Sequence, residues 1–269
     1  MSEYKEESRR LWNANPCGGR GGGLDDIEYA TLDYFRAVRY RRYEVSDPWI
    51  RKTIDFNAAR GKRLLEIGFG IGTDLLSFCE GGAEVHGIDI TDEHFRLAKR
   101  NFELHGRRAE LNLCDAACIE FPSGYFDFVY SLGVLHHTPD TVRCVSEAYR
   151  VLKPGGRLIL GVYHTFSAFH LVNLLLYNGL IKGKLRRLGY RGLLSTVERG
   201  ADGMSVAPLV KTYGKRQLRH ILSDFSTVEI KIAHFRRDHV PYVGRFIPVS
   251  WEEVLGTRVG WYLVAFAAK

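Results

Sequence analysis

From Arg63 onward, short apolar runs ended by Gly or Asp alternate with longer segments of helical periodicity. This alternation is typical of βαβ units, in which crossover helices join parallel strands. We expect strands at 63–67, 84–89, 109–113, 126–130 and 157–163, and helices at 73–80, 92–104 and 140–152. The rhythm stops over 164–210, which indicates an insertion, and resumes with a helix around 218–225. Two further apolar segments, 228–232 and 260–269, follow with no helix predicted between them, which favours an antiparallel end to the sheet.

Length and composition fit one ordinary domain. The chain has 269 residues, 45% apolar and 26% charged, and a chain of this size builds a large core without disulfides or metals. The longest apolar stretch, 166–181, contains polar residues and is shorter than the roughly 20 residues of a membrane span. The charged N-terminus lacks the apolar region of a secretory signal, so we expect a cytoplasmic protein. Five cysteines without a C-x-x-C pair fit reduced thiols, with Cys114 and Cys118 buried.

Residues 1–60 precede the alternation and are expected to form an arm and a helical cap. The glycine-rich stretch 18–23 has the composition of a flexible connector, and 29–43 has the spacing of a helix. Trp12 and Cys17 lie ahead of the connector, where a short arm would fold over a cleft and exclude water. A disordered tail is the alternative.

The first predicted strand runs into the motif Glu66-x-Gly68-x-Gly70-x-Gly72. Alternating glycines let the backbone turn tightly and approach a ligand closely. The dinucleotide motif G-x-G-x-x-G is excluded, because its third glycine would fall at Thr73 or Leu75. An acid in this loop is a poor neighbour for a pyrophosphate and suits an ammonium or a sulfonium group.

Two more acids follow the second and third predicted strands. Asp89 lies where a carboxylate commonly accepts hydrogen bonds from ribose hydroxyls, and Asp115 is placed to accept from an adenine amino group. Because parallel strands end at one edge of a sheet, Glu66, Asp89 and Asp115 should lie together. The alternative is that each is a helix N-cap or a solvated loop acid.

These motifs, together with Phe126-Asp127-Phe128-Val129, Leu135-His136-His137 and Leu152-Lys153-Pro154-Gly155-Gly156, resemble class I S-adenosylmethionine (SAM)-dependent methyltransferases. The similarity is closest to the branch that includes ubiquinone and menaquinone methyltransferases, and covers about 61–163. It implies a Rossmann-like, doubly wound, mostly parallel seven-stranded sheet with a reversed last strand. Residues 61–269 would be the SAM-binding domain, with 164–210 as a substrate lid.

The resemblance also implies a cofactor site, with SAM as cofactor and S-adenosylhomocysteine as product. Gly68, Gly70 and Gly72 would face the methionine moiety, Asp89 the ribose, and Asp115 with Ala116 the adenine. We assign Glu66, Phe69, Ile90 and Ser131 to the same site.

Methyl transfer from a sulfonium needs a collinear acceptor, and a base only where the acceptor must lose a proton. His136 and His137 follow the fourth predicted strand at the mouth of the cleft, and a histidine has the pKa range for that role. Adjacent residues normally point apart, so at most one should face the acceptor. The alternative is that one histidine caps the next helix. Tyr163, after the fifth strand, is a further candidate. We expect no metal, since the pair lacks a supporting ligand at helical spacing.

The acceptor is expected to be a small organic molecule, methylated at oxygen before nitrogen or carbon. The apolar stripe of 166–176 is either a lid with an acceptor pocket or ordinary packing. Followed by the basic run 182–191, it also suits a quinone-like lipid methylated at a membrane surface. An RNA substrate is the alternative suggested by the net charge of +7 and by basic clusters such as 36–42, although acids are interspersed and no RNA-binding module is present. A non-catalytic SAM-binding partner and an aminopropyl transferase share the fold and rank below these.

Overall fold

Seven strands form one sheet in the computed structural model, which describes residues 3–14, 16, 24–198 and 208–269. The strands are β1 (Arg63–Ile67), β2 (Glu84–Asp89), β3 (Glu110–Leu113), β4 (Phe126–Leu132), β5 (Leu152–Tyr163), β6 (Thr227–Ala233) and β7 (Tyr262–Ala268). Their order is β3-β2-β1-β4-β5-β7-β6. The first five pair in parallel, and β7 is antiparallel to both of its neighbours. The predicted doubly wound sheet with a reversed last strand is confirmed.

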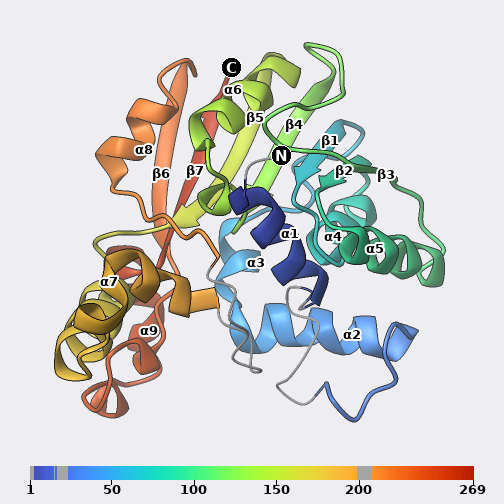
Figure 1. The fold of residues 1–269 in the computed structure, drawn as a ribbon. Helices are drawn as coiled ribbons and strands as arrows, with labels where there is room; N and C mark the ends of the chain where they lie inside the picture. Colours follow the sequence, from blue (N-terminus) through green and yellow to red (C-terminus); the bar gives the residue numbers. More distant parts are fainter. Residues whose placement is uncertain (1–2, 15, 17–23, 199–207) are drawn as a thin grey trace.

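Helices cover the sheet and its carboxyl edge (Figure 1). The α-helices are α1 (Glu3–Ala14), α2 (Leu32–Tyr40), α3 (Trp49–Thr53), α4 (Thr73–Glu80), α5 (Asp92–Leu104), α6 (Thr141–Val151), α7 (Lys184–Ser195), α8 (Lys215–Ile221) and α9 (Trp251–Val259). The π-helical segments are η1 (Arg41–Ser46) and η3 (Phe169–Ile181), and the 3-10 turns are η2 (Leu135–His137), η4 (Thr196–Glu198), η5 (Arg237–His239) and η6 (Gly244–Phe246).

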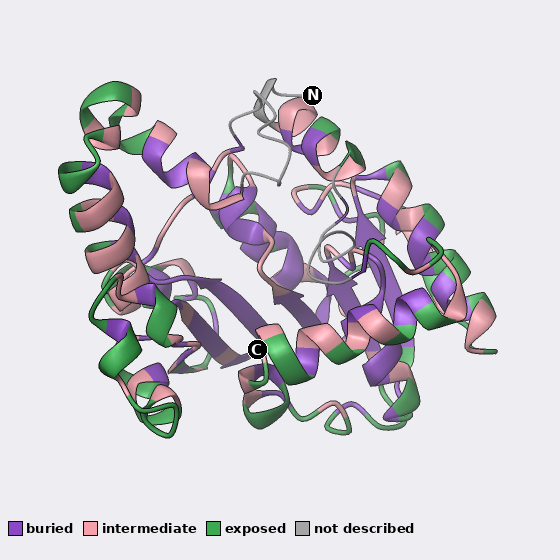
Figure 2. Ribbon diagram, turned by 90° about the horizontal axis from the view of Figure 1, so that it is seen from below, coloured by how far each residue is buried: buried purple, intermediate pink, exposed green. Residues whose placement is uncertain are grey.

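The central strands β1, β2, β4, β5 and β7 are mostly buried, as expected for a sheet covered by helices on both faces, whereas the edge strands β3 and β6 are partly exposed. Leu65 packs in the same core as Val145 of α6, whereas Leu64 packs on the other face with Leu75 of α4. Figure 2 shows the central strands buried and the outer helices exposed on one side. This two-sided burial explains why the strands appear in the sequence as nearly continuous apolar runs.

A helix between β6 and β7 was not predicted, and the structure contains α9 there. Trp251 and Val254 of this helix are exposed, so its apolar residues do not form the buried stripe by which a helix is detected in a sequence. The antiparallel pairing of β6 with β7 is nevertheless correct.

The N-terminal segment crosses the carboxyl edge of the sheet. Arg9 of α1 forms an ion pair with Asp92 of α5 at 2.9 Å, and Asn13 accepts a hydrogen bond from the backbone N–H of Glu93. The helix expected at 29–43 is α2 continued by η1. Cys17 and the glycine-rich connector lie outside the described residues.

No helix among the described residues has both the length and the apolar composition to cross a membrane. The cysteines that the structure describes, Cys79, Cys114, Cys118 and Cys144, are free thiols. Cys118 is exposed rather than buried, which corrects the expectation for that residue.

Candidate functional site

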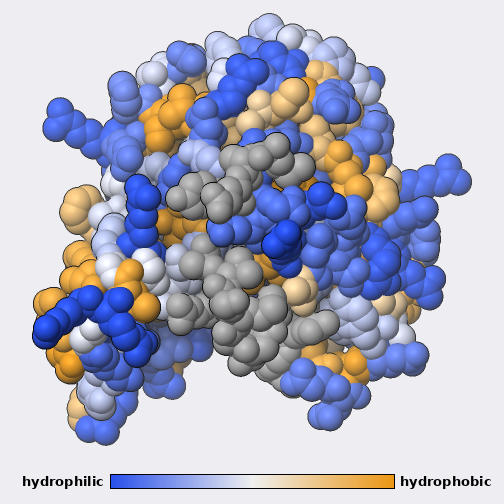
Figure 3. Space-filling model, viewed as in Figure 1, coloured by the Kyte–Doolittle hydropathy of each residue, from blue (hydrophilic) through white to orange (hydrophobic). Residues whose placement is uncertain are grey.

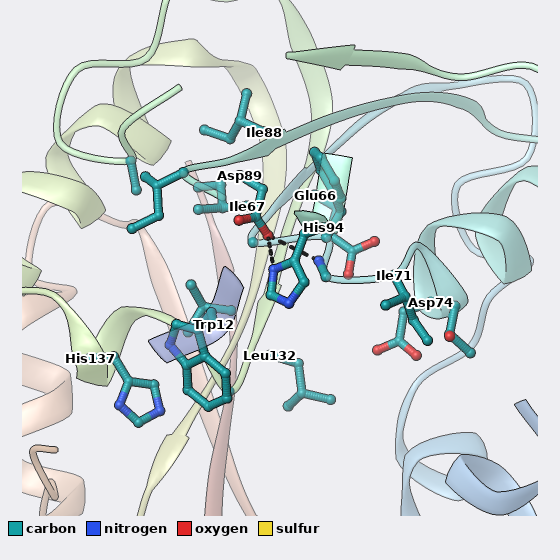
Figure 4. Close-up of a pocket in the computed structure, with 18 of the residues that line it drawn as sticks. Trp12, Glu66, Ile67, Ile71, Asp74, Ile88, Asp89, His94, Leu132 and His137 are labelled. Carbon is teal, nitrogen blue, oxygen red and sulfur yellow. Dashed lines mark hydrogen bonds and ion pairs between the residues drawn. The ribbon is translucent and has the colours of Figure 1, made fainter. Parts of the chain in front are cut away.

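A cavity of about 380 Å³ lies at the carboxyl ends of β1, β2 and β4, a volume within the usual range for small-molecule sites. It brings together most of the residues predicted for the site (Figure 4). These are Glu66, Gly68, Phe69, Gly70, Asp89, Ile90, Asp115, Ala116, His137 and Tyr163. Gly72, Ser131 and His136 are not among the residues that line it.

Two glycines of the loop after β1 have distinct steric roles. Gly70 has φ +54°, and a Cβ there would meet nothing within 4 Å, because its Cα faces the open cavity. A Cβ on Gly68 would lie 2.5 Å from a methyl carbon of Val134, so this position allows the loop to approach the segment after β4.

Gly72, which was predicted to face the methionine moiety, does not line the described cavity. Its Cβ would lie 3.2 Å from Ala98 of α5, so Gly72 permits close helix packing at the start of α4. Ser131 was also predicted to bind the cofactor, but its hydroxyl is buried and donates to the carbonyl of Ile67 at 3.2 Å. It therefore ties β4 to β1.

Glu66 is the buried acid of the loop, with 4% of its surface exposed. Among the described residues, its Oε2 atom has no hydrogen-bond partner. Burial, and then the charge of Asp74, raises the pKa of Glu66 well above its ordinary value. A buried carboxylate with an unpartnered oxygen in a cavity fits a cationic ligand group. Such a group would offset both the cost of burying the negative charge and the cost of the missing hydrogen bond.

Asp89 is held as a carboxylate by its own neighbours. One oxygen accepts from the backbone N–H and hydroxyl of Thr91, and the other accepts from the Gly70 N–H and lies 3.1 Å from His94 Nδ1. Burial would raise the pKa of Asp89, but His94 and these hydrogen bonds outweigh it and lower the pKa. A carboxylate offers about four lone-pair sites, so a ligand hydroxyl that binds Asp89 would have to replace one of these four contacts.

Helix α1 forms part of the cavity wall through Lys5, Ser8 and Trp12. The ammonium of Lys5 donates to a carboxylate oxygen of Asp115, whose other oxygen accepts from the Ala117 N–H at 2.9 Å. The acid expected to meet an adenine amino group is thus already in contact with the N-terminal arm. An arm over the cleft was predicted from the sequence, but this ion pair was not.

An ion pair between Arg42 and Asp74 was not predicted. Arg42 donates to both oxygens of Asp74, at 2.8 and 2.6 Å, and the hydroxyls of Tyr43 and Tyr130 donate to the same carboxylate. Burial would raise the pKa of Asp74, but Arg42 and these hydrogen bonds lower it.

The basic cluster 36–42 had suggested phosphate contacts. In the structure, Arg39 pairs with Glu80 and Arg36 lies 3.5 Å from Asp33. Together with the pair of Arg42, these contacts show that several cations of the cluster are neutralised within the chain.

The rings of the two histidines of η2 lie close together, with centroids 4.1 Å apart, so the expectation that they point apart is wrong. Only His137 lines the cavity. Its Nδ1 atom lies 2.8 Å from the carbonyl oxygen of Leu209, and its Nε2 atom lies 3.7 Å from Glu198. His136 is fully buried, and neither ring nitrogen has a partner among the described residues. Burial, and then His137, holds the pKa of His136 well below its ordinary value. His136 is therefore excluded from contact with a ligand in the cavity, contrary to its place among the catalytic candidates.

The alternative that a histidine caps the next helix is also wrong. The N-cap of α6 is Asp140, whose side chain accepts from the Arg143 N–H at 2.9 Å.

Tyr163 lines the cavity and donates its hydroxyl hydrogen to Glu198. Burial, and then the charge of Glu198, raises the pKa of Tyr163 well above its ordinary value. Tyr163 is therefore a neutral donor and not a base. Its ring stacks on Trp261 with centroids 4.3 Å apart, which fixes its position.

The insertion contributes Glu198 to the cavity, and this residue was missed because no local motif marks it. The apolar stripe of 166–176 does not line the described cavity wall, so the expectation of an acceptor pocket formed by that stripe is not met. Residues 199–207 of the insertion lie outside the described part of the chain.

His136, His137 and Glu198 place possible metal-ligating atoms within 4.8 Å of one another. Two of these side chains already have protein partners, since His137 contacts Leu209 and Glu198 accepts from Tyr163. A site without metal remains our prediction, although the supporting acid that the sequence lacked nearby is supplied by the tertiary structure.

The central part of the chain is similar to known methyltransferases. Residues 65–160 match the family model described as a methyltransferase domain. Over 105 residues the chain is 35% identical to phosphoethanolamine N-methyltransferase 2 of Caenorhabditis elegans, a match that covers 38% of this chain and 24% of the relative. Over 115 residues it is 34% identical to demethylmenaquinone methyltransferase of Thermus thermophilus, covering 42% and 52%. The chain spans about half or less of the length of these curated relatives.

Solved structures agree on the fold. The 1,6-didemethyltoxoflavin-N1-methyltransferase of Burkholderia thailandensis, solved with 1,6-didemethyltoxoflavin and S-adenosylhomocysteine bound, superimposes with a TM-score of 0.53. The match covers 99% of this chain and 89% of that protein at 19% identity. At this identity the similarity establishes the fold, and the chemistry of the cavity must be argued from its own residues.

Proposed function

We propose that this protein binds SAM in the cavity and methylates a hydroxyl group of a small organic acceptor, a proposal supported by the match of residues 65–160 to a methyltransferase domain. SAM, when bound, supplies an electrophilic methyl group on a positively charged sulfur. The residues of this chain must bind it, orient the acceptor, exclude water and take up the proton that the acceptor loses.

The acidic half of the cavity fits the cofactor. Glu66 presents an unpartnered carboxylate oxygen to a cationic group, and the open space above Gly70 admits a ligand against the backbone. Asp89 would accept from ribose hydroxyls in place of His94 or the Gly70 N–H, and Asp115 with Ala116 would border the adenine.

The other half of the cavity supports the acceptor assignment. It is lined by aromatic and apolar side chains, among them Trp12, Leu132, Val134 and Tyr262, which suit a largely apolar molecule. Trp12 lies 5.8 Å from the His137 ring between centroids, so α1 covers the catalytic end and limits access of water. Positioning in such a site accounts for much of the acceleration of a displacement reaction.

The contact between His137 Nδ1 and the Leu209 carbonyl is the observation that supports a hydroxyl oxygen as the atom that is methylated. A carbonyl only accepts, so Nδ1 must hold the proton and Nε2 is left as the acceptor. Nε2 would remove the hydroxyl proton as the oxygen attacks the methyl carbon, and the nearby carboxylate of Glu198 would stabilise the imidazolium formed. An acceptor without an ionisable proton would need none of this.

Methyl transfer from isotopically labelled SAM into a metabolite extract, followed by mass spectrometry, tests this function. We expect label in a compound whose fragmentation places the methyl on oxygen. Label on nitrogen or carbon would overturn the assignment of oxygen but would leave the proposed methyltransferase activity standing. Failure to bind SAM in calorimetry would overturn the cofactor as well.

A further inference from the structure

One lobe of the molecule combines exposed apolar side chains with cations that form no ion pair within the described residues. This docking lobe consists of η3, α7, residues 237–250 and α9, and lies at the lower left of Figure 1, beside the sheet. Its parts are joined by direct contacts. The hydroxyls of Tyr177 in η3 and Tyr242 lie 2.8 Å apart, and Asn173 donates to the carbonyl of Asp238. The surface of the lobe is therefore built from segments that are distant in sequence.

Large apolar side chains protrude from this surface. Ile181 is 69% exposed, Tyr242 71% and Phe246 74%. The other exposed apolar residues of the lobe are Leu171, Leu176, Leu180, Tyr190, Val243, Val249, Trp251 and Val254. Figure 3 shows hydrophobic and strongly hydrophilic residues side by side over this part of the molecule. Such a concentration on one end of a protein marks an interaction surface rather than scattered exposure.

Cations lie on or next to the same segments as these apolar residues. They are Lys182, Lys184, Arg186, Arg187, Arg191 and Arg245. Lys182 lies 4.7 Å from the ring centre of Tyr177, and the guanidinium of Arg245 lies 4.8 Å from that of Phe246. Within the described chain, none of the six forms an ion pair with a carboxylate. The acids of the lobe, by contrast, already have hydrogen-bond or ion-pair partners.

The lobe contains three acids, and each has a partner. Asp238 pairs with Arg236, Glu252 accepts from the Arg237 N–H, and Glu253 pairs with Lys52. The lobe thus offers uncompensated positive charge beside its apolar side chains.

We propose that the docking lobe binds the surface of an anionic lipid bilayer. Protruding apolar and aromatic side chains would enter the interface between head groups and acyl chains, and the adjacent Lys and Arg side chains would meet lipid phosphates. This inference goes beyond the proposed methyl transfer and does not depend on it.

Two other occupants fit the surface less well. Nucleic acid would use the cations but leave Ile181, Phe246 and their neighbours in water. A second copy in a twofold dimer would bring identical patches face to face, so that the six unpaired cations of each would repel those of the other. An anionic bilayer satisfies both the apolar and the basic part of the lobe.

Vesicle flotation tests the proposal with the full chain and no SAM. We expect the protein to float with phosphatidylcholine vesicles that contain phosphatidylglycerol, far less with pure phosphatidylcholine, and less as salt is raised, because salt screens exposed charges. The double variant Ile181→Ser, Phe246→Ser should lose binding. Its matched control is Tyr40→Ser, Val142→Ser, which removes two equally exposed apolar residues from α2 and α6 and should bind as wild type does.

The basic contribution is tested separately. Arg186→Glu, Arg187→Glu should weaken binding by about tenfold or more, since a single basic residue near an anionic surface accounts for roughly a fivefold change. Arg36→Glu, Arg100→Glu, which reverses two exposed cations of α2 and α5, should leave binding unchanged. SAM calorimetry on every variant separates this proposal from the proposed function, because the substituted residues do not line the cavity.

Three results would overturn the lipid assignment. Wild-type protein that stays at the bottom of the gradient would exclude bilayer binding. Equal losses of vesicle binding in the lobe variants and in their controls would show that binding depends on the general charge or hydrophobicity of the protein and not on the lobe. A dimer in size-exclusion chromatography that the Ile181→Ser, Phe246→Ser variant abolishes would assign the lobe to a second copy instead.

Discussion

The Nδ1 atom of His137 lies 2.8 Å from the carbonyl oxygen of Leu209, and this contact fixes which ring nitrogen faces the cavity. His136, its neighbour, is sealed beneath Tyr163, with ring centroids 3.8 Å apart. One histidine of the pair is thus placed for proton transfer, and the other is part of the core.

His137→Ala should therefore lower turnover by roughly 100- to 10,000-fold, the usual contribution of a general base, while SAM affinity measured by calorimetry changes little. His136→Leu serves as the matched control and should keep most of the activity. Equal turnover in the two variants would remove the general-base role.

Glu66→Gln should weaken SAM binding, because it removes the buried negative charge next to the cationic ligand. The pKa of Glu66 is raised in the cofactor-free protein, and a bound cation would lower it again. Wild-type affinity should therefore rise as pH rises through that pKa, with proton release detected by calorimetry in buffers of different ionisation enthalpy. Glu84→Gln, at an exposed acid of β2, is the control. Unchanged proton release in Glu66→Gln would place the cation elsewhere.

Gly70→Arg should abolish SAM binding while leaving the fold intact, because its side chain would fill the cavity. Gly106→Arg is a close control, since both glycines have positive φ, +54° and +61°, and neither Cβ would meet an atom within 4 Å. Both variants should lose about 1 kcal/mol of stability from the backbone conformation. Only the first should fail in calorimetry with SAM, and normal affinity there would mean that the ligand does not approach this loop.

His136→Leu should reduce the loss of stability in acid. The pKa of His136 in the folded state lies well below the ordinary value of 6.5, so the folded state binds fewer protons than the unfolded state. The folded state therefore has its full stability above about pH 6.5 and loses stability as the pH falls below that value. Removing two buried unpartnered nitrogens should also raise the unfolding free energy by about 1 kcal/mol near neutral pH. Urea unfolding at about pH 7 and about pH 5 measures both effects. His220→Leu, at an exposed site, should retain the wild-type slope.

Chelation by EDTA should leave activity unchanged, because His137 and Glu198 are engaged by Leu209 and Tyr163. Activity that is lost on chelation and restored by one added divalent ion would instead identify the cluster of His136, His137 and Glu198 as a metal site.

Local patterns were sufficient where the structure is local. The helix predicted at 92–104 is α5, with identical bounds, because its apolar spacing, its acidic first turn and Gly106 at its end all act within a few residues. Helix α9 was missed because Trp251 and Val254 are exposed, so its apolar residues do not form one buried stripe. The loop from Glu66 to Gly70 was predicted to approach a ligand because its glycines and acid are adjacent in sequence, and the structure places these residues on the cavity.

The sequence alone determined the βαβ order and that Glu66, Asp89 and Asp115 lie at one edge of the sheet, since parallel strands end on one side of a sheet whatever surrounds them. Tertiary structure decided which histidine faces the cavity, that α1 and Glu198 complete its wall, and that Arg42 neutralises Asp74. These contacts join residues tens of positions apart. Their geometry depends on how whole elements pack, and no periodicity or local spacing along the chain records that packing.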